Sequence, residues 1–183
     1  MGHPHLRDCL VGFSGCGVDT LGHGTAVAAA ICDLAGGVWI HSIGALDASG
    51  RCSADRIVEA LDESIGEGVD LINLSIGVMG IDLDTTFIGA LERLSDAGIK
   101  LVAPAASDGG WCFPGCMSGV EGVVVDIDAA RDRPTRRFHE GTELWFASPL
   151  PRDLPGLARD RNLQGVSMAV ANVTGHLAVQ MRP

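Results

Sequence analysis

The stretch Gly22-His23-Gly24-Thr25-Ala26-Val27-Ala28 joins a glycine-rich loop to an alanine-rich segment that runs to Ala35 and stops at Gly36-Gly37. Alanine has the highest helix propensity and a glycine pair ends a helix, so the pattern predicts a buried helix over residues 25–35. A histidine flanked by glycines lets another backbone or a bound molecule come close to it. The stretch therefore predicts an accessible histidine at the start of a core helix.

Outward from this helix, apolar runs alternate with helical patterns. Short apolar runs typical of buried strands occur at residues 38–46, 70–75, 99–105, 122–127 and 143–147. Helices are predicted at residues 53–66, with Ser53 as the N-cap, at residues 83–97, and from residue 166 onward. A turn is predicted at residues 108–110, a charged surface excursion at 129–141 and an irregular loop at 149–163.

This alternation predicts an α/β fold, with a mostly parallel central sheet covered by helices on both faces. The whole chain, residues 1–183, is predicted to form one domain. In doubly wound sheets of this kind, reactive groups gather at the carboxyl ends of the strands. The starts of the helices that follow those strands are therefore the places to look for chemistry.

Charge and hydropathy limit the partners that can be expected. The formal net charge of −10 argues against nucleic acid as the main partner. No apolar run approaches the roughly 20 residues that a membrane span needs. Residues 1–7 contain no apolar signal-peptide core, so a cytoplasmic location is expected.

Six cysteines stand at positions 9, 16, 32, 52, 112 and 116. Without an export signal, free thiols are the expected state. Cys112 and Cys116 are close enough in sequence to leave a disulfide open as an alternative. A metal site is the least favoured interpretation, because it would want tighter CxxC pairs or nearby histidines. We expect neither a metal nor another cofactor.

A second stretch, Gly165-Val166-Ser167-Met168-Ala169, places a serine at the start of the last predicted helix. Backbone N–H groups and the helix dipole stabilise negative charge at that end. Serine and histidine together form the proton-transfer pair of acyl-transfer enzymes. Taken singly, each residue has a plainer interpretation: a serine at a helix start is usually a cap, and a lone histidine is usually structural.

The order of four motifs resembles the subtilase family of serine proteases. Residues 23–28 resemble the family's HGTxVA, and residues 73–77 resemble its NxSxG strand. Residues 101–109 resemble the strand that leads to the family's oxyanion asparagine, and residues 165–175 resemble GTSMAxPxVAG. The resemblance covers nearly the whole chain, with the motifs in the family's order.

The resemblance implies a subtilisin-like three-layer, doubly wound fold. It implies that Ser167 is the nucleophile and His23 the general base, acting on a peptide or protein substrate. Ser107 falls on the position of the oxyanion asparagine. The segment Ser75, Ile76 and Gly77 would present its backbone to an extended substrate peptide.

The chain departs from the family at the catalytic aspartate. The family carries this residue on a strand just ahead of an HPxL segment, which residues 3–6 resemble, so the chain is expected to lack that strand and to be truncated at its N-terminus relative to the family. Asp8 and Asp19 are the only acidic residues before His23, and neither stands in the expected motif. Loss of the aspartate costs about 10⁴-fold in rate, a magnitude borrowed from other serine proteases, subtilisin among them.

Two further departures follow. Serine replaces the oxyanion asparagine at position 107. Loss of an oxyanion donor lowers kcat on the order of 10²–10³-fold. After the nucleophile, Ala171 replaces a proline and Asn172 a histidine. These last two changes are expected to matter little, because the residues mainly shape the helix.

Three functional interpretations stay open. The chain is an active endopeptidase whose aspartate comes from a further segment or a partner, a slow peptidase with a Ser/His dyad, or a pseudoprotease that only binds peptides. Some intracellular subtilases that resemble this chain trim leader peptides of ribosomally made natural products, which is an analogy only. Because a missing strand would leave an exposed edge or apolar trough, we expect a homo-oligomer or a partner chain that supplies it.

Overall fold

A central sheet of seven strands organises the chain. The computed structural model describes residues 7–11, 19, 22–47, 50–79, 84–107, 109–158 and 161–182. The strand order is β2-β1-β3-β4-β7-β9-β8, and all neighbouring strands are parallel except the antiparallel pair β8 and β9. The strands of this sheet are β1 (Arg7–Val11), β2 (Trp39–Ile43), β3 (Leu71–Leu74), β4 (Lys100–Pro104), β7 (Glu121–Val125), β8 (Thr135–His139) and β9 (Thr142–Ala147).

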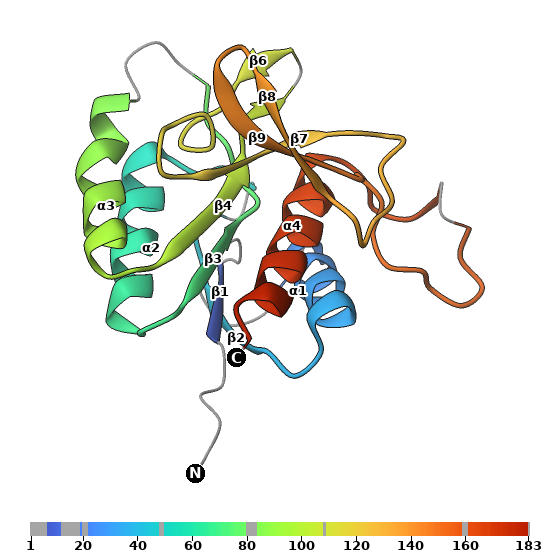
Figure 1. The fold of residues 1–183 in the computed structure, drawn as a ribbon. Helices are drawn as coiled ribbons and strands as arrows, with labels where there is room; N and C mark the ends of the chain where they lie inside the picture. The colour runs from blue at the N-terminus through green and yellow to red at the C-terminus, as the bar shows by residue number, and fades with distance from the viewer. Residues whose placement is uncertain are drawn as a thin grey trace.

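Four helices cover the sheet in two layers. Helices α2 (Ala54–Gly66) and α3 (Asp84–Asp96) lie on one face, and α1 (His23–Ala35) and α4 (Val166–Gln180) lie side by side on the other (Figure 1). The predicted three-layer α/β fold with a mostly parallel sheet is confirmed. No helix in the described ranges is long and apolar enough to cross a membrane.

Local sequence signals account for most elements. Ser53 caps α2, because its side chain accepts a hydrogen bond of 3.1 Å from the backbone N–H of Arg56. Ile57 and Leu61 are four residues apart and fully buried, so they form the core-facing stripe of α2. Gly98, which ends α3 as predicted, has a φ of 71° that favours glycine.

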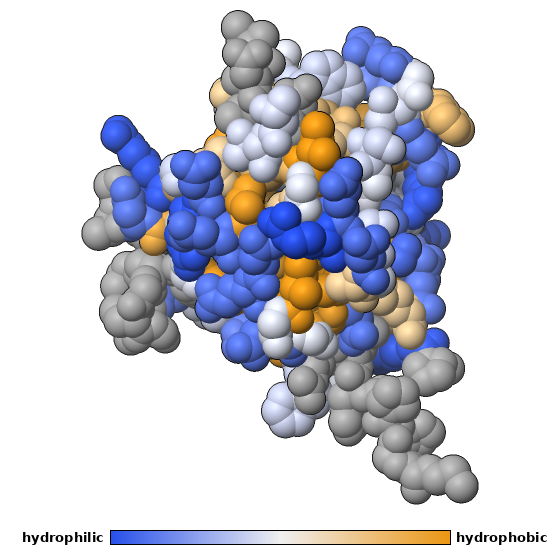
Figure 2. All heavy atoms as spheres, turned by 90° about the vertical axis from the view of Figure 1, so that its left-hand side faces the viewer, coloured by the Kyte–Doolittle hydropathy of each residue, from blue (hydrophilic) through white to orange (hydrophobic). Residues whose placement is uncertain are grey.

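Strand β3 is buried on both faces, and its side chains alternate between the two helical layers. Ile72 and Leu74 pack with α2 and α3, whereas Leu71 packs with α4. Asn73 shares the face of Leu71, because successive side chains of a strand point to opposite faces. Figure 2 views the α2 and α3 side, where apolar patches lie between charged side chains.

The sequence analysis was wrong about two strands. Strand β1 was missing from the predicted strands, yet it lies inside the sheet and pairs with both β2 and β3. The described strands leave no vacant place between neighbours, so the expected trough is not found among them. Among the described strands, β2 and β8 stand at the two ends of the sheet, as edge strands do in any open sheet.

Strand β8 lies within the segment predicted to be a charged surface excursion. All five of its residues are exposed, so it carries no alternation of apolar and polar side chains that would have revealed a strand. Only its pairing with β9, which a local pattern does not report, makes it a strand.

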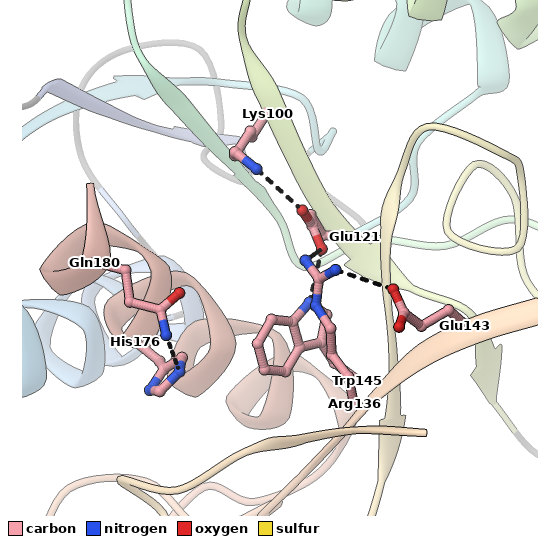
Figure 3. Close-up of polar contacts among 7 residues, drawn as sticks. All are labelled: Lys100, Glu121, Arg136, Glu143, Trp145, His176 and Gln180. Carbon is pink, nitrogen blue, oxygen red and sulfur yellow. Dashed lines mark hydrogen bonds and ion pairs between the residues drawn. The ribbon is translucent and has the colours of Figure 1, made fainter. Parts of the chain in front are cut away.

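A cluster of charges fastens β8 to the rest of the sheet (Figure 3). Arg136 on β8 bonds to Glu121 at 2.6 Å and to Glu143 at 3.0 Å, and its guanidinium lies 4.6 Å from the centre of the Trp145 ring. Glu121 also accepts a hydrogen bond from Trp145 Nε1 and pairs with Lys100 Nζ at 3.3 Å. The cluster therefore ties β4, β7, β9 and β8 together at the amino ends of the parallel strands.

Candidate active site

Helices α1 and α4 run parallel, so their first turns lie at the same end of the molecule. Val27 near the start of α1 and Met168 near the start of α4 belong to one apolar cluster. Further along, Gly175 of α4 lies against α1: a Cβ added there would be 2.9 Å from Leu34 Cβ. From Val27 to Leu34 on α1, and from Met168 to Gly175 on α4, the chain advances by the same number of residues in the same direction, so the two helices are parallel. His23 is the first residue of α1 and Ser167 the second of α4.

Ser167 is bound to the residue that follows β3. Its Oγ donates to the backbone oxygen of Ser75 at 3.2 Å, and Ser75 Oγ donates to the backbone oxygen of Ser167 at 3.2 Å. Because Ser75 follows directly on β3, this pair sits at the carboxyl end of the sheet. Gly165, which precedes the helix, has a φ of 134° that favours glycine.

A buried amide supports this pair of serines. Asn73 Nδ2 donates to Ser75 Oγ at 2.9 Å, and Thr174 Oγ1 lies 2.9 Å from Asn73 Oδ1. Asn73 and Thr174 are fully buried. The interior of α4 is therefore linked through β3 to Ser75, which fixes the orientation of the group that holds Ser167.

Asn73→Ala is expected to lower the free energy of unfolding by about 1–3 kcal/mol, because it leaves buried partners without their hydrogen bonds. Asn162→Ala is the matched control, since the hydrogen bonds of Asn162 are exposed, and its effect should stay within about 0.5 kcal/mol. Urea unfolding followed by circular dichroism measures both. Equal midpoints for the two variants would contradict a supporting role for Asn73.

His23 lies close to the carboxylate of Asp19, which accepts hydrogen bonds from the first turn of α1. Asp19 Oδ1 accepts from the backbone N–H of Gly22 at 2.8 Å, and Oδ2 accepts from the N–H and the hydroxyl of Thr25, both at 2.8 Å. These bonds flank His23 and cap α1, whose N-cap residue Gly22 has no side chain to do so. Asp19 thus shapes the turn that presents His23.

The pKa of His23 is lowered from its usual 6.5, mainly because burial removes water from the charged imidazolium; the negative charge of Asp19 acts in the opposite sense and raises it. The imidazole is therefore neutral at pH 7 and able to accept a proton. Within the described part of the chain, no hydrogen bond joins the His23 ring to Ser167. The prediction that the two side chains lie within or near hydrogen-bond reach stays a prediction.

Asp19→Asn is expected to lower the His23 pKa further, because it removes the charge that favours the protonated ring while keeping a side chain that can cap the helix. A titration of the imidazole signals by NMR measures the midpoint. Asp47→Asn, in a separate loop where Asp47 bonds to Arg51, serves as the control and should leave the midpoint unchanged. An upward shift in Asp19→Asn would contradict the electrostatic role of Asp19.

The predicted substrate-binding segment continues from Ser75. Ile76 is half-buried and Gly77 exposed, and among the described residues the backbone groups of these two find no hydrogen-bonding partner. Val78, one residue further, pairs with Phe113 in an antiparallel bridge of 3.0 and 2.8 Å. The free backbone at Ile76 and Gly77 is what an added peptide strand would need.

Gly77 is constrained by close packing against neighbouring residues of the protein. A Cβ at this position would lie 3.0 Å from Cys112 Cβ and 3.0 Å from Pro104 Cγ. A side chain there would press on the protein itself. A Gly77→Val variant would thus disturb packing, so it does not isolate the approach of a peptide.

Ser107, the residue at the expected oxyanion position, lies in a short hairpin beyond β4. It belongs to strand β5 (Ala106–Ser107), which pairs with β6 (Gly110–Trp111) and brings Ser107 opposite Gly110. Ser107 is half-buried, and none of the contacts among the described residues joins it to Ser167. The structure thus brings Ser75 and Ser167 into contact, whereas Ser107 stays at the same sheet edge without a direct link.

The chain is similar to several known proteases. No protein-family model matches the chain. It is 28% identical over 174 residues to the thermostable alkaline protease of Halalkalibacterium halodurans, covering 88% of this chain and 47% of that protein. It is 26% identical over 144 residues to the minor extracellular protease Epr of Bacillus subtilis, covering 72% of this chain and 22% of Epr. The chain thus spans about half or less of these relatives.

Solved structures agree on the fold. The prenylagaramide maturation protease PagA superposes with a TM-score of 0.75 at 20% identity, over 98% of this chain and 76% of that one. A lanthipeptide protease gives 0.75 at 16% identity, over 99% and 74%, and the self-cleaved protease domain of PatA gives 0.73 at 18%, over 100% and 82%. The chain therefore has a subtilisin-like fold.

The cysteines of the subtilisin-like domain form no described disulfide. Cys32, Cys52, Cys112 and Cys116 form no disulfide, so the alternative of a bond between Cys112 and Cys116 is not realised. Burial raises the pKa values of the Cys52 and Cys116 thiols, which keeps both protonated and unreactive at neutral pH. Cys9 and Cys16 are the remaining two; the side chain of Cys9 and all of Cys16 lie outside what is described.

Two cavities of about 540 and 470 Å³ lie away from the serine pair. Their linings include Lys100, Glu121 and Thr142, the first residues of three parallel strands, so they open at the opposite edge of the sheet. Lys100, Glu121, Arg136 and Glu143 there already bond to one another. No group of three or more metal-ligating side chains was found in the described ranges.

Proposed function

We propose that this domain is a serine endopeptidase that cleaves a peptide or protein substrate, with Ser167 as nucleophile and His23 as general base. The observation that carries the proposal is the pair of hydrogen bonds between Ser167, at the start of α4, and Ser75, at the carboxyl end of β3. The start of α1, with its neutral histidine, lies at the same end of the molecule. Acyl transfer needs a serine hydroxyl on a fixed element and a base that can take its proton.

The start of α4 also supplies a donor for the developing oxyanion. The N–H groups of Met168 and Ala169 bond to the backbone oxygen of Gly165 at 3.0 and 3.2 Å. The N–H of Ser167 has no partner among the described residues. A backbone donor at this place supports transition-state charge whatever the residue at position 107 contributes.

An extended peptide is the substrate form that the edge segment favours. Ile76 and Gly77 follow Ser75, which bonds to Ser167, so a peptide strand bound along them would pass the nucleophile. PagA is named for prenylagaramide maturation and another neighbour is a lanthipeptide protease, which supports a peptide precursor as the substrate class.

The alternative is a pseudoprotease that binds such a peptide without cleaving it. The observation in its favour is Asp19, because both of its carboxylate oxygens accept hydrogen bonds from Gly22 and Thr25 at the start of α1. A histidine without an orienting carboxylate can rotate or take the unproductive tautomer.

The deciding experiment is covalent labelling with an alkyl fluorophosphonate, followed by peptide mapping in a mass spectrometer. The proposal expects the phosphonyl adduct on Ser167 and no adduct in Ser167→Ala. Ser148→Ala is the control, since Ser148 is buried beyond the end of β9 and does not contact Ser167. A folded wild-type chain that binds peptide but forms no adduct supports the pseudoprotease instead.

A further inference from the structure

Arg131 links the two helices that carry His23 and Ser167. It stands on the connection between β7 and β8, with 20% of its side chain exposed. Nη2 donates to the backbone oxygen of Ala30 at 2.8 Å and Nη1 donates to Asp33 at 2.5 Å, both on α1. Nε donates to Asn172 Oδ1 on α4 at 3.0 Å. One planar guanidinium thus binds both helices at once.

Asn172 makes this contact rigid on the α4 side. The residue is fully buried, and its Nδ2 donates to the backbone oxygens of Ser148 at 3.0 Å and Leu150 at 2.9 Å. With Arg131 on its Oδ1, both ends of the amide are bonded. The replacement at this position, which the sequence analysis expected to matter little, therefore anchors α4 to the segment after β9.

The rest of the contact between α1 and α4 constrains the relative position of the two helices less than the hydrogen bonds of Arg131 do. It consists of apolar residues, some of them small, such as Ala30, Ala171 and Gly175, and some large, such as Val27, Ile31 and Met168. Van der Waals contacts between these apolar side chains are individually weak and have no preferred direction, whereas a guanidinium with three hydrogen bonds in a fixed fork tolerates little displacement. The guanidinium therefore adds a directional constraint on the register of the two helices.

We propose that Arg131 is a positioning residue, which holds the starts of α1 and α4 in the register that brings His23 to Ser167. The inference rests on the proposed function of these two side chains. Proton transfer requires hydrogen-bond reach between the base and the nucleophile. A displacement of about 1 Å caused by a distant residue can cost about 10²-fold in rate.

The test compares Arg131→Met and Arg131→Lys with a control variant at Arg93, an arginine that joins two helices on the other face of the sheet. Arg93 bonds to Asp62 through Nε at 2.8 Å and Nη2 at 2.9 Å, and so joins α3 to α2. Arg93→Met thus removes a helix-to-helix guanidinium that is remote from the site. Two quantities are measured for each variant: kcat and KM for an activated ester, and amide hydrogen exchange of α1 and α4.

We expect Arg131→Met to lower kcat about 10- to 100-fold with KM within about twofold, and to speed exchange in α1 and α4. Arg131→Lys should behave similarly, because an ammonium keeps the charge but not the fork. Arg93→Met should leave both quantities near wild type. If Arg131→Met does not fold, Asp33→Asn removes one arm of the clamp at an exposed position and should shift kcat in the same direction.

An unchanged kcat in folded Arg131→Met and Arg131→Lys overturns the proposal, whatever the exchange shows. Equal losses in Arg93→Met also overturn it, because they indicate general destabilisation. A wild-type chain without Ser167-dependent turnover contradicts the proposed function instead. Hydrogen exchange then decides separately whether Arg131 holds the helix pair, and unchanged exchange in α1 and α4 overturns that claim.

Discussion

Ser167→Ala is expected to bring hydrolysis of an activated ester down to the background rate, and the difference from the wild-type chain should be only about 10²-fold. In subtilisin, loss of the serine costs about 2 × 10⁶ and loss of the aspartate alone about 3 × 10⁴. These magnitudes belong to that enzyme and are borrowed here. The catalytic groups act as a unit, so the effects of losing them do not add. A chain that already lacks the aspartate therefore keeps a serine-dependent rate enhancement of only about 10²-fold, which is the ratio of these two losses.

The measurement is ester and peptide turnover by wild type and Ser167→Ala, each alone and with an added peptide that carries the family's aspartate motif. An increase of up to about 10⁴-fold with the added segment, abolished by Ser167→Ala, supports an aspartate supplied from outside. Brisk serine-dependent cleavage by the chain alone contradicts our expectation of low activity. Peptide binding without serine-dependent cleavage in any combination favours the pseudoprotease.

Gly115→Ala is expected to destabilise the domain by about 3–5 kcal/mol, a large fraction of the stability of a single domain. A Cβ at Gly115 would lie 2.0 Å from the backbone oxygen of Pro104 and 2.8 Å from that of Ala103. Gly122 on β7 is packed in turn against the Gly115 backbone, since a Cβ added at Gly122 would lie 2.3 Å from the Gly115 oxygen. No side-chain rotation relieves contacts with backbone atoms, so β4 or the 112–116 segment must move.

Gly66→Ala is the matched control for this change. Gly66 is the last residue of α2, and a Cβ there meets nothing within 4 Å. Alanine should leave stability unchanged or raise it by about 0.5 kcal/mol, because it restricts the unfolded chain. Thermal unfolding should therefore place Gly115→Ala well below wild type and Gly66→Ala at or slightly above it. Equal transitions for wild type and Gly115→Ala would contradict the close packing of residue 115 on β4.

Local patterns in the sequence were sufficient for most of the architecture. Helix α2 followed from the Ser53 cap and the spacing of Ile57 and Leu61, because capping and periodicity act between residues a few positions apart. The buried strands β3 and β4 followed from their apolar runs, whereas β2, predicted as buried, is mostly exposed at the edge of the sheet. The alternation of strands with helices predicted the parallel sheet. The same alternation led to the carboxyl edge, where Ser75 and Ser167 meet.

The tertiary structure decided what depends on contacts between distant residues. Strand β8 exists because it pairs with β9, and β1 lies inside the sheet because β2 and β3 pair with it on either side. Arg131 reaches Asp33 and Asn172 across 98 and 41 positions of sequence. No local propensity reports such bonds, since hydrogen-bond geometry at that separation is fixed only once the helices have packed. The sequence alone selected His23 and Ser167 as candidate catalytic residues, and only the packing of the chain placed Arg131 between the two helices that carry them.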